Sequence, residues 1–170
     1  LSNLMFIFPA LIAEKILASI YIILLPLAFR FLLKQSAASS PMDFLGLYFV
    51  FPFGYSFLFY FGFYNFHLGL VILLITLGLW IKFSKMGIVK TKNLTLLLFL
   101  TFLLYFSHLF VLAIFLAVMG YMTIKDYLVG ANQKEIFFKS IKNRLILVAP
   151  TLILSTIYLT NHQVSLVSTE

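Results

Sequence analysis

The side chains best suited to chemistry in this sequence are a few polar groups within or at the ends of long apolar stretches. They are a carboxylate, an ammonium, an amide, a phenol and an imidazole: Glu14, Lys15, Asn65, Tyr105 and His108. A charge at the centre of a membrane costs on the order of 2.5–3.5 kcal/mol unless it has a partner or faces a cavity. We therefore predict these five as substrate-binding residues.

The apolar stretches that carry these groups determine the fold class. Residues 63–83 contain no formal charge before Lys82, and about 20 helical residues cross the ~30 Å hydrocarbon layer of a bilayer. Hydrophobic residues make up 63% of the chain and charged residues 10%, against roughly 45–50% and 25% in soluble domains. The sequence predicts an all-α, polytopic transmembrane helix bundle in a lipid bilayer.

The hydrophobic pattern divides this single transmembrane domain, residues 1–170, into about five spans. The predicted spans are 16–33, 44–60, 63–83, 94–122 and 145–159. Residues 133–144 are predicted as one amphipathic interfacial helix, since apolar side chains recur on one face and lysines lie elsewhere.

The lysines in and next to the loop 84–93 indicate which helix ends face the cytoplasm. Lys/Arg-rich loops face the cytoplasm, and this loop contains Lys85, Lys90 and Lys92 and closely follows Lys82. Glu14, Lys15 and Asn65 then lie on the extracytoplasmic side. His108, about 21 Å into the fourth span, lies in the outer half of the membrane.

Residues 94–122 allow two interpretations. One long helix places the basic segment 123–144 outside, against the charge rule. A hairpin that turns at Ser107–His108 restores the rule, but its arms would be only about 13 residues long and no Gly, Pro or Asn marks the turn. The length favours one long, tilted helix, and the hairpin is the alternative.

Helical phase places the polar groups on faces. At 100° per residue, Asn65, Gly69 and Thr76 share one face of their span, and His67 points the opposite way. Thr101, Tyr105 and His108 share a face of the next span. Two interpretations remain for each residue. Asn65 with Gly69 can be packing between helices, His108 can bond to a neighbouring carbonyl, and Glu14–Lys15 can be an interfacial pair.

Several function classes are excluded or disfavoured by the sequence. There is no cysteine, and the three histidines and five acids show no metal-ligand spacing. The sequence contains no phosphate-binding loop and no nucleophile elbow. The net charge of +7 is a topology signal in a membrane protein. We predict no catalytic residue within this chain, no metal, no cofactor and no nucleic-acid partner.

Three segments resemble a known family: AEKILASIYIILLPLAFRFLL, GFYNFHLGLVILLITLGLWIKF and LLYFSHLFVLAIFLAV. They resemble the central portion of large bacterial polytopic proteins that are similar to GT-C (mannosyltransferase-like) glycosyltransferases, over about residues 10–160. The resemblance implies transfer from a polyprenyl-phosphate sugar at the extracytoplasmic face of the bacterial inner membrane. Lys15, Asn65 and His108 would bind the donor phosphate, and Glu14 would hold Lys15 or contact a sugar hydroxyl.

The chain departs from this family at the catalytic acid. The family carries an aspartate motif in its first extracytoplasmic loop, whereas Asp43, the one aspartate before the fourth span, falls in a predicted cytoplasmic loop. The catalytic part is therefore expected upstream of Leu1, in a longer protein whose further helices are partners. Two alternatives are a transporter-type bundle, suggested by Pro26, Pro52 and Pro150, and a non-catalytic scaffold with glycine-mediated helix contacts.

Overall fold

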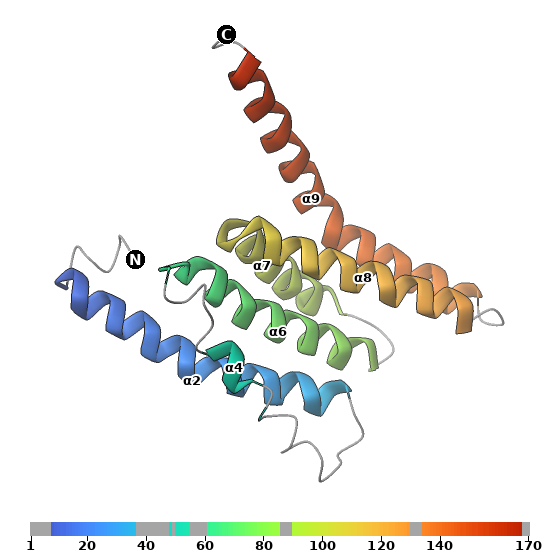
Figure 1. The fold of residues 1–170 in the computed structure, drawn as a ribbon. Coiled ribbons are helices and arrows are strands. Elements are labelled where there is room, and N and C mark those ends of the chain that lie inside the picture. The colour runs from blue at the N-terminus through green and yellow to red at the C-terminus, as the bar shows by residue number, and fades with distance from the viewer. Residues whose placement is uncertain are drawn as a thin grey trace. The chain divides into compact units, whose positions relative to one another are not determined.

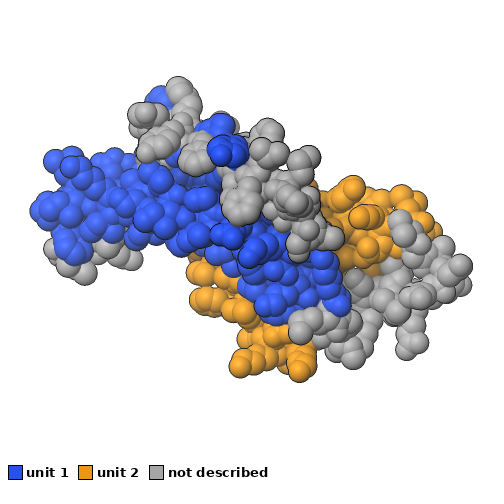
Figure 2. Space-filling view, turned by 90° about the horizontal axis from the view of Figure 1, so that it is seen from below, with its two compact units in different colours: residues 1–87 blue, residues 88–170 orange. Residues whose placement is uncertain are grey.

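The computed structural model describes residues 8–36, 48, 50–54, 61–85, 90–129 and 134–167. Every regular element within these ranges is a helix, which confirms the all-α prediction. The helices are α2 (Ala10–Ser36), α4 (Phe51–Gly54), α6 (Tyr64–Lys85), α7 (Thr91–Ser107), α8 (Leu109–Val129) and α9 (Lys134–Val167) (Figure 1). The chain divides into two compact units, Leu1–Gly87 (unit 1) and Ile88–Glu170 (unit 2) (Figure 2), and each is described by itself.

Four of the described helices are long and apolar enough to cross a membrane. They contain the segments Ala10–Ser36, Tyr64–Lys85, Leu109–Leu128 and Ile141–Tyr158. The apolar helix α7 is shorter, at 17 residues, the lower end of the length that spans a bilayer. The chain is a multi-pass membrane protein by the length and composition of its helices. The predicted span 44–60 lies mostly outside the described residues, which there include α4.

In unit 1, α2 and α6 pack side by side and run in the same direction (Figure 1). At their beginnings the hydroxyl of Tyr64 donates to the carboxylate of Glu14. At their ends Lys85 Nζ donates to the backbone carbonyl of Gln35, with an N–O distance of 2.6 Å. The two helices are therefore parallel, and α6 begins at the end of the pair at which α2 begins.

The packing between α2 and α6 has an apolar core and one very close approach. Tyr21, Leu25 and Ala28 form a buried cluster with Val71 and with Val50. Farther along, a Cβ atom added to Gly78 would lie 2.6 Å from Cε1 of Phe31 and 3.5 Å from the Leu32 Cα. A small residue is required at this point, because it lets the helix backbones approach.

In unit 2, the stretch predicted as one helix over 94–122 is two helices, and the chain reverses direction between them (Figure 1). His108 separates α7 from α8 with an extended backbone (φ −167°, ψ 126°). Its Nδ1 accepts a hydrogen bond from the Phe110 N–H, with a distance of 3.2 Å. This is the geometry of an N-cap, with an imidazole in the place usually taken by Asn, Asp or Ser.

The objection to a hairpin was the shortness of its arms, and the observed bounds remove it. Helix α7 begins at Thr91 and α8 continues to Val129, beyond the limits of the apolar run in both directions. The hydroxyl of Ser107 donates to the Leu103 carbonyl, with a distance of 2.7 Å, and so serves a carbonyl in the last turn of α7. A serine and a histidine thus complete the two helix ends without Gly, Pro or Asn.

The capping role of His108 can be tested by substitution. We expect His108→Asn to leave the free energy of unfolding nearly unchanged, because the asparagine side chain can accept the same N–H bond. His108→Leu should lower it by about 1 kcal/mol, the usual effect of removing an N-cap acceptor. Unfolding of both variants in mixed detergent micelles measures the difference. Equal stabilities would contradict the capping role.

Helix α9 also differs from the prediction, because the interfacial helix 133–144 and the span 145–159 form one continuous helix. The helix changes direction about midway along its length (Figure 1), where Pro150 lies. Proline has no N–H for the carbonyl four residues earlier and its ring displaces that carbonyl, which bends a helix. The predicted apolar face at Phe137 and Phe138 falls on side chains outside the described set.

Candidate functional site

Three of the five predicted site residues lie at one end of the α2–α6 pair. Glu14 accepts the hydrogen bond from Tyr64, the residue before Asn65, and Lys15 follows Glu14 in the first turns of α2. The side chains of Lys15 and Asn65 are exposed. The contact between Tyr64 and Glu14 therefore brings a carboxylate, an ammonium and an amide to the same end of two parallel helices.

The residues on the predicted polar face of α6 differ in burial. Gly69 and Thr76 are buried, but Asn65 on the same calculated face is exposed. His67, expected to point the other way, is only 1% exposed and packs against α2. Its ring lies edge-on to Tyr21, with centroids 4.8 Å apart, and its Nδ1 lies 2.8 Å from the Phe63 carbonyl oxygen.

His67 was predicted to point away from Asn65, Gly69 and Thr76, but no packing role was predicted for it. The helix is buried on two opposite faces: His67, Val71 and Gly78 lie on one, and Leu73 and Thr76 lie on the other. The spacing of residues 67, 71 and 78 follows the helical repeat and could have identified the face toward α2. Thr76 is an additional example of a polar group satisfied locally, since its hydroxyl donates to the Ile72 carbonyl.

The other two predicted site residues, Tyr105 and His108, belong to unit 2. The Tyr105 hydroxyl donates to the Leu154 carbonyl of α9 over a long distance of 3.4 Å. His108 caps α8, as described above. Thr101, predicted on the same face, is buried and donates to the Leu97 carbonyl of its own helix. These contacts give each residue a place in the packing of unit 2, and their role in substrate binding stays a prediction.

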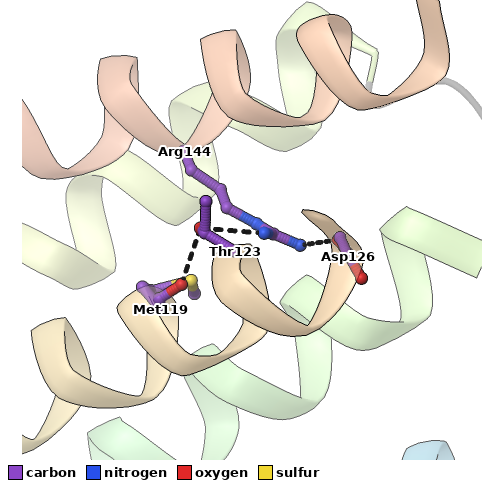
Figure 3. Close-up of polar contacts among 4 residues, drawn as sticks. All are labelled: Met119, Thr123, Asp126 and Arg144. Atoms are coloured by element: carbon purple, nitrogen blue, oxygen red, sulfur yellow. Dashed lines mark hydrogen bonds and ion pairs between the residues drawn. The ribbon is translucent and has the colours of Figure 1, made fainter. Parts of the chain in front are cut away.

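A second polar cluster, which sequence analysis did not anticipate, joins α8 to α9 (Figure 3). Figure 3 shows Arg144 reaching from α9 toward Thr123 and Asp126 on α8. Its guanidinium lies 2.5 Å from the Asp126 carboxylate and 2.9 Å from the Thr123 hydroxyl. The Thr123 hydroxyl in turn donates to the Met119 carbonyl, with a distance of 2.8 Å.

The two charged partners of this cluster differ in their exposure. The Arg144 side chain is 9% exposed, whereas the Asp126 side chain is 45% exposed. The arginine was predicted as the last residue of the interfacial helix 133–144, and it directly precedes the apolar run of α9. Thr123 and Asp126 are three residues apart and therefore share a face of α8. This spacing could have indicated a polar contact on that face. The cluster joins α8 to α9, the helices that precede and follow residues 130–133.

With both clusters described, the chain can be compared with known proteins. No family model, curated protein or solved structure matches it. The function must therefore be argued from the chemistry of the groups themselves.

The two clusters offer different chemistry. Arg144 is already engaged by a carboxylate and a hydroxyl, so this cluster positions helices. The end of the α2–α6 pair instead presents an exposed ammonium and an exposed amide next to a carboxylate that is held by a phenol. Within the described residues, no group of three His, Cys, Asp or Glu side chains is placed to hold a metal ion. The candidate site is therefore the α2–α6 end, which can bind an anionic, hydroxyl-bearing group.

Proposed function

We propose that this chain is the helix bundle of a GT-C-like membrane glycosyltransferase and that Glu14, Lys15 and Asn65 bind its polyprenyl-phosphate sugar donor. The observation that carries the proposal is the hydrogen bond from Tyr64 to Glu14, which joins the beginnings of two parallel helices. The charge rule assigns these helix ends to the extracytoplasmic side. The resemblance of three sequence segments to that family supplies the reaction class.

The groups at this end are complementary to each part of such a donor. The Lys15 ammonium and the Asn65 amide can donate hydrogen bonds to phosphate oxygens, and charge-assisted bonds of this kind are the strong ones. The Glu14 carboxylate can accept a hydrogen bond from a sugar hydroxyl while Tyr64 fixes its orientation. Exposed apolar side chains of α2, among them Leu11 and Ile20, provide a surface for the prenyl chain.

The transporter-type alternative is less well supported. Transporter sites are built from discontinuous helices, and prolines at residues 26 and 150 suggested such interruptions. Helices α2 and α9 both continue through these prolines. The described residues thus contain no interruption at either position.

Binding of defined lipids to the purified chain tests the proposal. Native mass spectrometry should detect undecaprenyl phosphate bound more tightly than undecaprenol, which lacks the phosphate. Lys15→Gln should weaken undecaprenyl phosphate binding about tenfold, the equivalent of one hydrogen bond to a charged group. Lys15→Arg is the matched control, because arginine keeps the positive charge and the hydrogen-bond donors at the same position.

Two results would contradict the proposal. The first is equal binding of undecaprenol and undecaprenyl phosphate by the unmodified chain. The second is an equal loss of undecaprenyl phosphate binding in Lys15→Gln and Lys15→Arg, since an equal loss would show that the positive charge at residue 15 does not bind the phosphate.

A further inference from the structure

The connections between the helices determine which helix ends share a side of the membrane. Helices α2 and α6 are parallel, so their final turns lie on one side. The connections 86–90 and 130–133 extend to at most about 20 Å, less than the ~30 Å hydrocarbon core. The end of α6 therefore shares a side with the beginning of α7, and the end of α8 with the beginning of α9.

The reversal at His108 completes this assignment. With α7 and α8 as separate crossings, the end of α8 returns to the side on which α7 begins. The final turns of α2, α6 and α8 and the first turns of α7 and α9 then all lie on one side. The segment 123–144, which contradicted the charge rule when 94–122 was taken as one helix, now obeys it.

Positive charge is concentrated on this side. The exposed basic side chains near these helix ends are Arg30, Lys34, Lys82, Lys85, Lys90, Lys92, Lys125 and Lys142. Among the described residues, the opposite helix ends carry Lys15 alone. Each of these side chains lies at or near the end of an apolar helix, at the depth at which the lipid headgroup layer begins.

We propose that the helix ends on this side form, within each unit, a binding surface for anionic phospholipid headgroups of the cytoplasmic leaflet. A lysine or arginine near an anionic membrane surface contributes about fivefold to association, the equivalent of ~1 kcal/mol. Arg144 takes no part in this surface, because its side chain is 9% exposed and is engaged by Asp126. The inference does not depend on the proposed transferase function, which concerns the opposite helix ends.

Lipid selectivity of the reconstituted chain tests the surface. In phosphatidylcholine vesicles, spin-labelled phosphatidylglycerol should associate with the chain in preference to spin-labelled phosphatidylcholine. The variant Lys82→Gln/Lys90→Gln/Lys92→Gln should reduce that preference at least fivefold, and high salt should reduce it in the unmodified chain. The charge-keeping variant Lys82→Arg/Lys90→Arg/Lys92→Arg is the matched control and should leave the preference unchanged.

Cysteine labelling tests separately which helix ends lie on the same side of the membrane, because the chain contains no native cysteine. Single cysteines at Ser84 and Asn143 should react with an impermeant maleimide from the same side of oriented vesicles, and a cysteine at Gly62 from the opposite side. Labelling of positions 84 and 143 from opposite sides would overturn the assignment. Equal association of the two spin-labelled lipids, or equal effects of the glutamine and arginine triple variants, would overturn the lipid-binding surface.

Discussion

Replacing Asp126 with alanine is expected to lower the free energy of unfolding by about 3 kcal/mol, because it leaves the Arg144 guanidinium buried without its carboxylate. Replacing Arg144 with methionine should cost less, about 1 kcal/mol. Methionine keeps the apolar stem of the side chain, and the remaining Asp126 carboxylate is 45% exposed and can be hydrated. Asp126→Ala should therefore lower the free energy of unfolding more than Arg144→Met, because the charge that it leaves unpaired is the less exposed one.

Reversible unfolding in mixed micelles measures both variants, and a double variant sharpens the test. Asp126→Ala/Arg144→Met removes both charges and should be more stable than Asp126→Ala alone. Lys125→Ala is the matched control, since Lys125 is an exposed neighbour on the same helix. If Asp126→Ala were no more destabilising than Lys125→Ala, the ion pair would have no role in joining α8 to α9.

Enlarging Gly78 is expected to separate α2 from α6. Gly78→Leu should lower the free energy of unfolding by about 3 kcal/mol, the upper range for overpacking, because its side chain would meet the Phe31 ring and the backbone at Leu32. Gly78→Ala should cost about 1 kcal/mol, since a ring can rotate away more easily than backbone can move. Gly120→Ala is the control, because nothing lies within 4 Å of an added Cβ there.

A second substitution separates close packing from helix propensity. In a Phe31→Ala background, Gly78→Ala should become neutral or stabilising, because the ring that opposes the new methyl group is gone and alanine favours helix. Gly78→Leu should remain destabilising in that background, because the backbone at Leu32 is still in place. Equal costs of Gly78→Ala with and without Phe31 would show that the ring does not limit the approach of the helices.

The helical fold follows from the length of the apolar runs, because a lipid environment leaves the backbone no other way to satisfy its polar groups over most of this chain. The end of α7 could not be found in the same manner. The rules for helix ends look for Gly, Pro and Asn, whereas His108 uses its imidazole as a cap. The charge rule did indicate that the prediction was wrong, because a single helix over 94–122 placed the basic segment 123–144 on the extracytoplasmic side.

The candidate site shows a similar limit. The depth of Glu14, Lys15 and Asn65 follows from their position at the beginnings of apolar helices, but the contact between Tyr64 and Glu14 joins residues 50 positions apart. Nothing in local sequence specifies which helix will pack beside α2, or that the pair will be parallel. For the same reason the burial of His67 against Tyr21 and the pairing of Arg144 with Asp126 were not predictable from spacing alone.

The parallel arrangement of α2 and α6 has a consequence for the order of folding. Helix hairpins such as α7–α8 join neighbours in sequence, and contacts between them can form as soon as both helices have been synthesised. Helix α2 cannot contact α6 until α6 itself has been synthesised and inserted, and Ser36 and Tyr64, the facing bounds of the two helices, are far apart in sequence. Since contacts of long sequence separation form late, unit 1 should be the slower of the two to mature. During that interval α2 must wait in the membrane with the face that carries Tyr21 and Leu25 uncovered.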